Sequence, residues 1–136
     1  MKKGYYTLLI FLLFSCKKDC YNSTYKIINN SAQPISILFF DNDISTSRNI
    51  NIGDTLMIQY NKANNLIDLS DSAMITFNNK KKQFHSKFFF YDCGDRQMGT
   101  NIFCPNQYNS KAIDKCTVDY IFTFTPNDYA TADTIL

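Results

Sequence analysis

Cysteines are the residues of this chain with the clearest capacity for chemistry. The sequence contains five, and four of them remain when Cys16 is set aside: Cys20, Cys93, Cys104 and Cys116. Four thiols can form two disulfides or help to bind a zinc ion. Zinc sites usually contain a C-x₂-C pair or several histidines, whereas these intervals contain no such pair and the chain has one histidine. The spacing favours two disulfides, for which three connectivities exist.

One long segment, Asp92 to Lys115, contains or adjoins three of these cysteines and shows no strand pattern. Loops longer than about 12–15 residues are uncommon in compact domains and are usually functional or disordered. Cross-links would hold such a loop in place. We expect one disulfide, Cys93–Cys104, to close the loop and a second, Cys20–Cys116, to join the first and last strands.

The same loop mixes aromatic and polar side chains, as recognition loops often do. We therefore predict that it forms a non-catalytic binding surface for a protein or glycan partner. The candidate binding residues are Asp95, Arg96, Gln97, Phe103 and Tyr108.

Catalytic chemistry has little support in the sequence. His85 is the only histidine, so a nucleophile–histidine–acid site would have to use it, and no serine lies in a G-x-S-x-G context. Glutamate is absent, and no glycine-rich loop could hold a phosphate. A lone histidine is usually exposed or at the edge of a core. We predict no enzyme activity, no catalytic residues and no cofactor.

Two other clusters have alternative interpretations. The oxygen-rich segments Asp41–Asp43 and Asp92/Asp95 could bind Ca²⁺, but neither matches an EF-hand loop, and such clusters are more often turns. We predict no metal site. The aromatic run Phe88–Tyr91 is interpreted as a buried strand, with a platform for stacking on sugars as the alternative.

The N-terminus resembles an export signal. Two lysines precede an apolar run from Tyr5 to Phe14, and a small residue, Ser15, stands directly before Cys16. The run is half the length of about 20 residues that a membrane-spanning helix needs. These features predict a cleaved signal peptide.

The segment Leu13-Phe14-Ser15-Cys16 resembles the lipobox of bacterial lipoproteins, although Phe14 is bulkier than the usual residue there. The resemblance implies that Cys16 is acylated and becomes the first residue of the mature chain. Two or three acyl chains would anchor the protein to a membrane, since one chain holds only weakly. In Gram-negative lipoproteins Asp after the acylated cysteine favours the inner membrane; Lys17 occupies this place, which implies the outer membrane, with either face open.

Short strands separated by turns account for most of the mature chain. The last predicted strand, Thr117–Thr125, alternates apolar and polar residues, and Asn78-Asn79-Lys80 is the best hairpin signal. Thr125-Pro126 predicts the start of a short helix that ends near Ala132. The predicted strands cover 24–28, 34–40, 48–52, 55–60, 73–77, 83–86, 87–91 and 117–125, with a loop over 61–72.

This spacing predicts an all-β fold: a single antiparallel β-sandwich, immunoglobulin-like in layout, with a short C-terminal helix. Residues 1–15 form the cleaved signal peptide, residues 16–22 a lipidated tether and residues 23–136 the β-sandwich domain. The layout as a whole resembles small envelope lipoproteins with a short sandwich body.

Charge restricts the class of partner. The chain has 14 basic and 12 acidic residues, and removal of residues 1–15 takes away two lysines, so the mature chain is formally neutral. A nucleic-acid partner is excluded on these grounds, because it requires a basic surface. The leading hypothesis is a membrane-anchored envelope lipoprotein that acts as a binding module. The alternative is a structural or accessory subunit of an outer-membrane complex.

Overall fold

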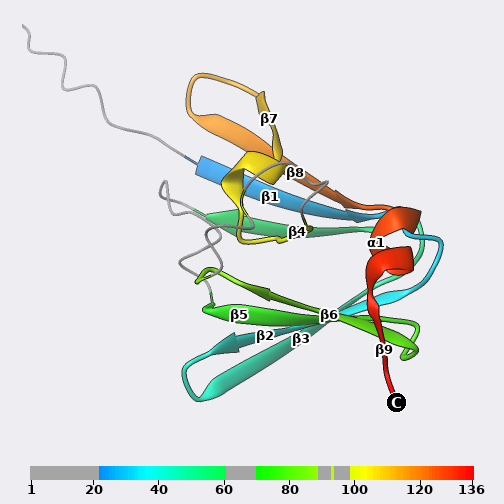
Figure 1. Cartoon of the computed structure of the whole chain (residues 1–136). Coiled ribbons are helices and arrows are strands. Elements are labelled where there is room, and N and C mark those ends of the chain that lie inside the picture. Colours follow the sequence, from blue (N-terminus) through cyan, green and yellow to red (C-terminus); the bar gives the residue numbers. More distant parts are fainter. Residues whose placement is uncertain (1–21, 61–69, 89–92, 94–98) are drawn as a thin grey trace, which may run out of the picture.

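The computed structural model describes residues 22–60, 70–88, 93 and 99–136. They form an all-β sandwich of two sheets with one short α-helix at the C-terminal end (Figure 1). Within the described residues, no helix has the length and apolar character to cross a membrane. The predicted signal peptide, Cys16 and residues 61–69 of the loop predicted over 61–72 lie outside the described residues, and Ser72 of that predicted loop is the first residue of a strand.

The larger sheet, the five-stranded sheet, is antiparallel throughout. Its strands lie in the order β3 (Ile44–Ile50), β2 (Ile35–Asp41), β5 (Ser72–Phe77), β6 (Lys81–Ser86) and β9 (Asp133–Thr134). The predicted Asn-rich hairpin is confirmed, because β5 and β6 pair around Asn78 and Asn79, whose φ angles are 48° and 54°. Asparagine tolerates this left-handed region better than most residues, and tight hairpin turns require it.

The second sheet, the four-stranded sheet, contains an exception to the predicted antiparallel pairing. Its strands lie in the order β4 (Thr55–Tyr60), β1 (Asn22–Asn29), β8 (Thr117–Phe124) and β7 (Asn109–Ala112). β1 and β8 run parallel, whereas β4 and β7 are antiparallel to their neighbours. A parallel pair needs a crossover connection, and here the connection runs through the other sheet.

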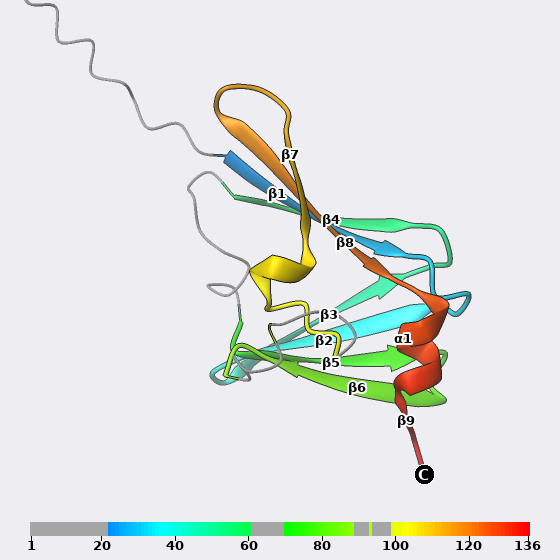
Figure 2. The same ribbon diagram turned by 45° about the horizontal axis from the view of Figure 1, so that its top comes forward.

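The two sheets face each other in Figure 2, and the buried residues of the hydrophobic core come from strands of both. Alternate residues of β1, β2 and β5 point inward, as the period of two requires, and the largest side chains of the core are completely buried aromatics and isoleucines. Tyr25 stacks on Tyr120 with ring centroids 5.0 Å apart, and Phe122 packs against Phe124 at 5.1 Å. The fully buried core side chains include Ile27, Ile37, Ile75, Phe77, Phe122 and Phe124.

Two predicted strands differ from the observed ones. The strand predicted over 48–52 lies at 44–50, because a two-residue turn at Asn42 (φ 48°) lets β3 pair with β2 along its whole length. The strand predicted over 87–91 is wrong at its start: Lys87 and Phe88 form a turn, and Phe88 is 63% exposed. The rest of that segment lies outside the described residues.

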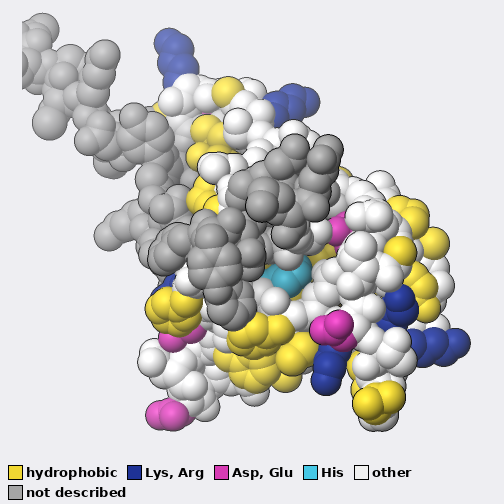
Figure 3. Space-filling model, viewed as in Figure 1, with side chains coloured by type: hydrophobic (Ala, Val, Ile, Leu, Met, Phe, Trp, Pro, Cys, Tyr) yellow, Lys and Arg dark blue, Asp and Glu magenta, His cyan; other side chains and the backbone are white. Residues whose placement is uncertain are grey.

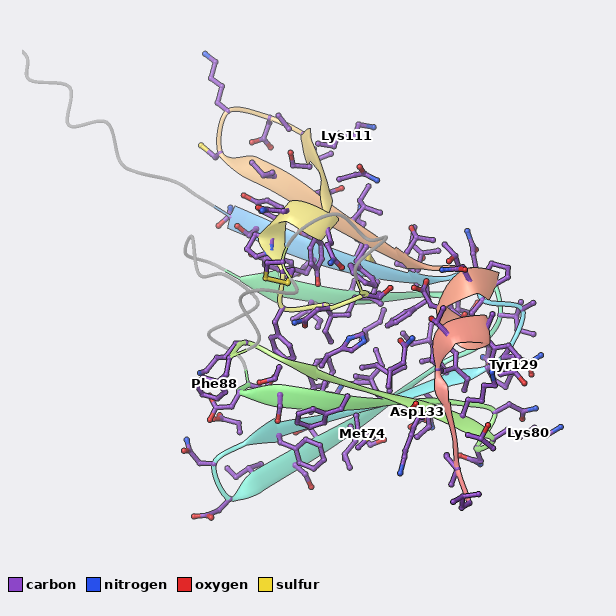
Figure 4. The ribbon with its side chains drawn as sticks, viewed as in Figure 1. Met74, Lys80, Phe88, Lys111, Tyr129 and Asp133 are labelled. Atoms are coloured by element: carbon purple, nitrogen blue, oxygen red, sulfur yellow. A yellow bond between two sulfur atoms is a disulfide. The ribbon has the colours of Figure 1, made fainter. Side chains whose placement is uncertain are left out.

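The C-terminal helix confirms the predicted capping residues. Helix α1 (Pro126–Thr131) follows Thr125 and has proline in its first turn. The Thr125 amide and hydroxyl both donate to one carboxylate oxygen of Asp128, at 2.6 and 2.8 Å, which satisfies donors that a helix start otherwise leaves free. Tyr129 packs on Phe77, so α1 covers the turn end of the β5–β6 hairpin (Figure 4).

Candidate functional site

The second half of the predicted recognition loop is part of the folded sandwich and not a free surface loop. The prediction that residues 92–115 contain no strand is wrong, because a 3₁₀ helix (Pro105–Gln107) and strand β7 occupy part of it. β7 has four exposed residues and no buried apolar alternation, so the sequence carried no signal for it. Its pairing with β8 creates the strand.

The structure contradicts the predicted binding role of Phe103, and it shows Tyr108 partly buried against the core. Phe103 is 2% exposed and belongs to the hydrophobic core. Tyr108 packs edge-on against Tyr25 at 5.7 Å, and its hydroxyl donates to the Ile102 carbonyl at 2.8 Å. The other three candidate residues, Asp95, Arg96 and Gln97, lie outside the described residues.

Side-chain hydrogen bonds hold this inserted segment in place. Asn101 donates to the Ser86 carbonyl at 2.9 Å, and its own backbone N–H donates to Gln107 Oε1 at 2.9 Å. Gln107 also donates to the Gly99 carbonyl. Both side chains are buried, so these bonds offset the cost of removing polar groups from water. The segment therefore closes the sandwich on the β6 side.

Two disulfides involve the described cysteines. Cys93 and Cys104, the pair favoured by the sequence, are bonded with an Sγ–Sγ distance of 2.10 Å and Cα atoms 4.9 Å apart. Cys116 is also disulfide-bonded. Its predicted partner, Cys20, lies outside the described residues, as does the predicted lipidation site, Cys16.

His85 is a buried core residue and not an exposed or edge one. Its Nδ1 accepts the Ile102 N–H at 3.2 Å, so Nε2 carries the proton and faces Gln83 Oε1 at 3.3 Å. The ring stacks on Phe124. Burial lowers the pKa of His85 from 6.5 to about 3, against an opposing effect of the Asp128 carboxylate. A neutral imidazole with both nitrogens engaged by the fold is unavailable as a general base.

The oxygen-rich segment Asp41–Asp43 forms the turn between β2 and β3, which was the favoured interpretation. Both aspartates are exposed. The part of the chain that the structure describes contains no group of three or more metal-ligating side chains close enough to bind an ion. The other segment considered for calcium, Asp92/Asp95, lies outside it.

A pocket of about 220 Å³ opens between the edge strands of the two sheets, β3 and β4. The turn of the β2–β3 hairpin, next to the lining residues Asp41 and Ile44, lies at the end of the sandwich opposite α1 (Figure 1). β3 residues 44–49 are all exposed, although Ile44, Thr46 and Arg48 lie on the face of the sheet that carries the core residues Ile37 and Phe39. We call this the β3–β4 pocket; its lining residues are Phe39, Asp41, Ile44, Thr46, Arg48, Ile58 and Ser70.

Ser70 distinguishes this pocket from other depressions of the surface. Its side chain is 3% exposed, and its Oγ is the one buried side-chain polar atom without a hydrogen-bond partner among the described residues. Buried hydroxyls in native proteins almost always have a partner, and leaving one without costs about 1–3 kcal/mol. A second pocket, of about 260 Å³ beside Asn78 and Asn79, contains no such atom.

The outer face of the five-stranded sheet carries an apolar row. Leu38, Met74 and Phe84 are aligned across β2, β5 and β6, and Phe84 is 50% exposed. Hydrophobic side chains gather over this part of the sheet in Figure 3, and Met74 lies on the side away from the four-stranded sheet in Figure 4. We call these three residues the outer row. Exposed apolar rows of this kind often contact other proteins.

Comparison of the chain with protein-family models, with curated proteins and with solved structures finds no match.

Proposed function

We propose that this protein is a non-catalytic binding module, anchored to the outer membrane through acyl chains on Cys16, whose ligand site is the β3–β4 pocket. The observation that carries the proposal is the buried Ser70 hydroxyl, which lines the pocket and has no partner among the described residues. A ligand could supply the missing hydrogen bond. The engagement of His85 by Ile102 and Gln83 supports a binding role over catalysis.

The proposal moves the binding surface from the 92–115 loop to the opposite edge of the sandwich. In the described part of that loop the aromatic side chains pack on the core. At the β3–β4 pocket, by contrast, Thr46 and Arg48 project from an exposed edge strand toward an apolar floor formed by Phe39. Small-molecule sites commonly combine an apolar lining with a few polar groups in this way.

Blocking the pocket tests the proposal. Thr46→Phe places a large ring in the pocket, whereas Ser47→Phe places the same ring on the opposite face of β3. Ligands and proteins cross-linked to the anchored chain in intact cells are then identified and quantified. We expect Thr46→Phe to remove at least one that wild type and Ser47→Phe retain. Identical profiles for the two variants would contradict the pocket as the binding site.

An accessory subunit of an envelope complex is the second candidate, and the outer row favours it. Ser47 pairs with Leu38, so Ser47→Phe also alters this face. Partners lost with both Ser47→Phe and Phe84→Ser but kept with Thr46→Phe would indicate that the sheet face, and not the pocket, makes the contact.

Anchoring is tested separately at Cys16. Because Cys16 completes the lipobox-like segment, Cys16→Ser should abolish incorporation of labelled palmitate and leave an uncleaved precursor. Cys20→Ser is the matched control and should remain labelled. A Cys16→Ser protein that still incorporates palmitate would show that the anchor is elsewhere.

A further inference from the structure

We propose that the β3–β4 pocket selects a short zwitterionic peptide of about four residues with one aliphatic side chain. The inference rests on the proposed function, since it names the ligand class of the same pocket. Three features of the lining support it: its size and apolar wall, the hydroxyl of Ser70, and two opposite charges at its two ends.

The apolar wall sets the size of the ligand body. Phe39 and Ile44 come from one sheet and Ile58 from the other, so an aliphatic side chain placed between them is covered on both sides. The volume is about 220 Å³. An apolar cavity of about 150 Å³ is enough to hold benzene. The pocket therefore takes one large aliphatic side chain together with part of a backbone.

Ser70 provides a fixed polar contact at one end of the pocket. Asp71 donates its N–H to the Phe40 carbonyl, which places Ser70 beside the turn end of β2, near Asp41. A hydroxyl can donate to one group and accept from another. Since Asp41 carries a negative charge and lines the same pocket, a ligand ammonium group would find both an acceptor and a counter-charge there.

Arg48 provides the opposite charge at the other end. Asp41 pairs with Ile44, and Arg48 lies four residues further along β3, which at about 3.3 Å per residue is about 13 Å from Ile44. Its guanidinium donates to the Ser47 carbonyl at 3.1 Å, and it forms no ion pair with another described residue. Its remaining donors suit a carboxylate, which arginine can bind through two parallel hydrogen bonds.

These positions favour a zwitterion over a simple acid or base. A ligand with only a carboxylate would leave Ser70 and Asp41 without a cationic partner, and one with only an ammonium group would leave Arg48 unpaired. A ligand with both groups, separated by a short chain, pairs each charge while its side chain occupies the wall between Phe39 and Ile58.

A matched set of four probes, long enough to span about 13 Å when extended, tests the inference: glycyl-leucyl-glycyl-glycine, its C-terminal amide, its N-acetyl derivative and the doubly capped form. Each is titrated into detergent-solubilised full-length protein, and backbone amide chemical shifts are followed. We expect the zwitterion to bind about threefold to fivefold more tightly than either singly capped form, the range for a partly exposed ion pair. The doubly capped form should bind most weakly, and the largest shifts should fall on the lining residues.

Variants assign each preference to a side chain. Arg48→Gln should remove the preference for a free carboxylate, with Lys82→Gln as a control away from the pocket. Asp41→Asn should remove the preference for a free amine, and Asp43→Asn, which alters an exposed acid of the same turn outside the lining, should not. Ser70→Ala should weaken binding of every form while leaving the ligand-free protein at least as stable, because the hydroxyl has no partner there to lose.

The outcomes separate this inference from the proposed function. If the doubly capped probe binds as tightly as the zwitterion and Thr46→Phe blocks both, the charge selection is wrong and the pocket is still a binding site. If no probe causes saturable shifts, the ligand class is wrong, and the comparison of Thr46→Phe with Ser47→Phe in cells decides the function independently.

Discussion

Phe103→Ala is expected to lower the free energy of unfolding by about 3–5 kcal/mol, the usual cost of removing a buried phenylalanine. The side chain is 2% exposed and lies in the core with Ile102. Asn101 and Gln107 hold the backbone around it, so the segment cannot easily collapse into the space left behind. A loss of this size is a large part of the 5–15 kcal/mol that stabilises a typical domain.

Urea unfolding of the two proteins measures the effect, and Phe84→Ala is the matched control. Phe84 is a phenylalanine of the same domain but is 50% exposed on the outer row, so its truncation should cost less than about 1 kcal/mol. The comparison also tests the burial of Phe103. If Phe103→Ala were no more destabilising than Phe84→Ala, Phe103 would be a surface residue and free to contact a partner.

His85 should make the fold sensitive to mild acid. Its pKa is about 3 in the folded protein and about 6.5 when unfolded. A base whose pKa is lowered by folding is neutral in both states above pH 6.5, where the fold keeps its full stability. As the pH falls below 6.5, only the unfolded chain gains a proton, so stability is lost progressively toward pH 3. At pH 4.5 the expected loss from this residue is about 3 kcal/mol.

The comparison with His85→Gln isolates the histidine from the aspartates, which titrate in both proteins. Glutamine can still accept the Ile102 N–H but does not titrate. Urea unfolding at pH 7.5 and pH 4.5 should therefore show a clearly smaller loss for His85→Gln than for wild type. Equal losses would mean that His85 is protonated in the folded state, which its buried position between Ile102 and Phe124 argues against.

The sandwich is asymmetric in a way that bears on function. The β6 side of the sandwich is covered by the segment around Asn101 and by α1. Both are joined to β6 by side-chain hydrogen bonds. The other side, between β3 and β4, has no such covering among the described residues and contains the pocket with Ser70. We propose that the first edge serves stability and that the second edge, with the pocket, serves binding.

The local sequence alone determined those strands, turns and helix ends that depend on the types of a few neighbouring residues. The alternation of Thr117–Phe124 predicted β8, the two asparagines at 78 and 79 predicted a hairpin, and Thr125-Pro126 predicted the helix start. Each depends on short-range physics: side-chain period, tolerance of positive φ, and satisfaction of free N–H groups. The all-β class followed from their sum.

Tertiary structure decided the rest, because the deciding contacts join residues far apart in the chain. From the sequence alone, Phe103 is an aromatic residue in a loop. In the structure it is buried because His85 and Ser86 of β6 bind its neighbours Ile102 and Asn101. The parallel pairing of β1 with β8 brings together the two ends of the domain, which no local pattern encodes. The pocket likewise forms only because β3 and β4, which no local pattern relates, lie at the same edge of the two sheets. Burial is a property of the assembled sheets, whereas propensity is a property of the residues.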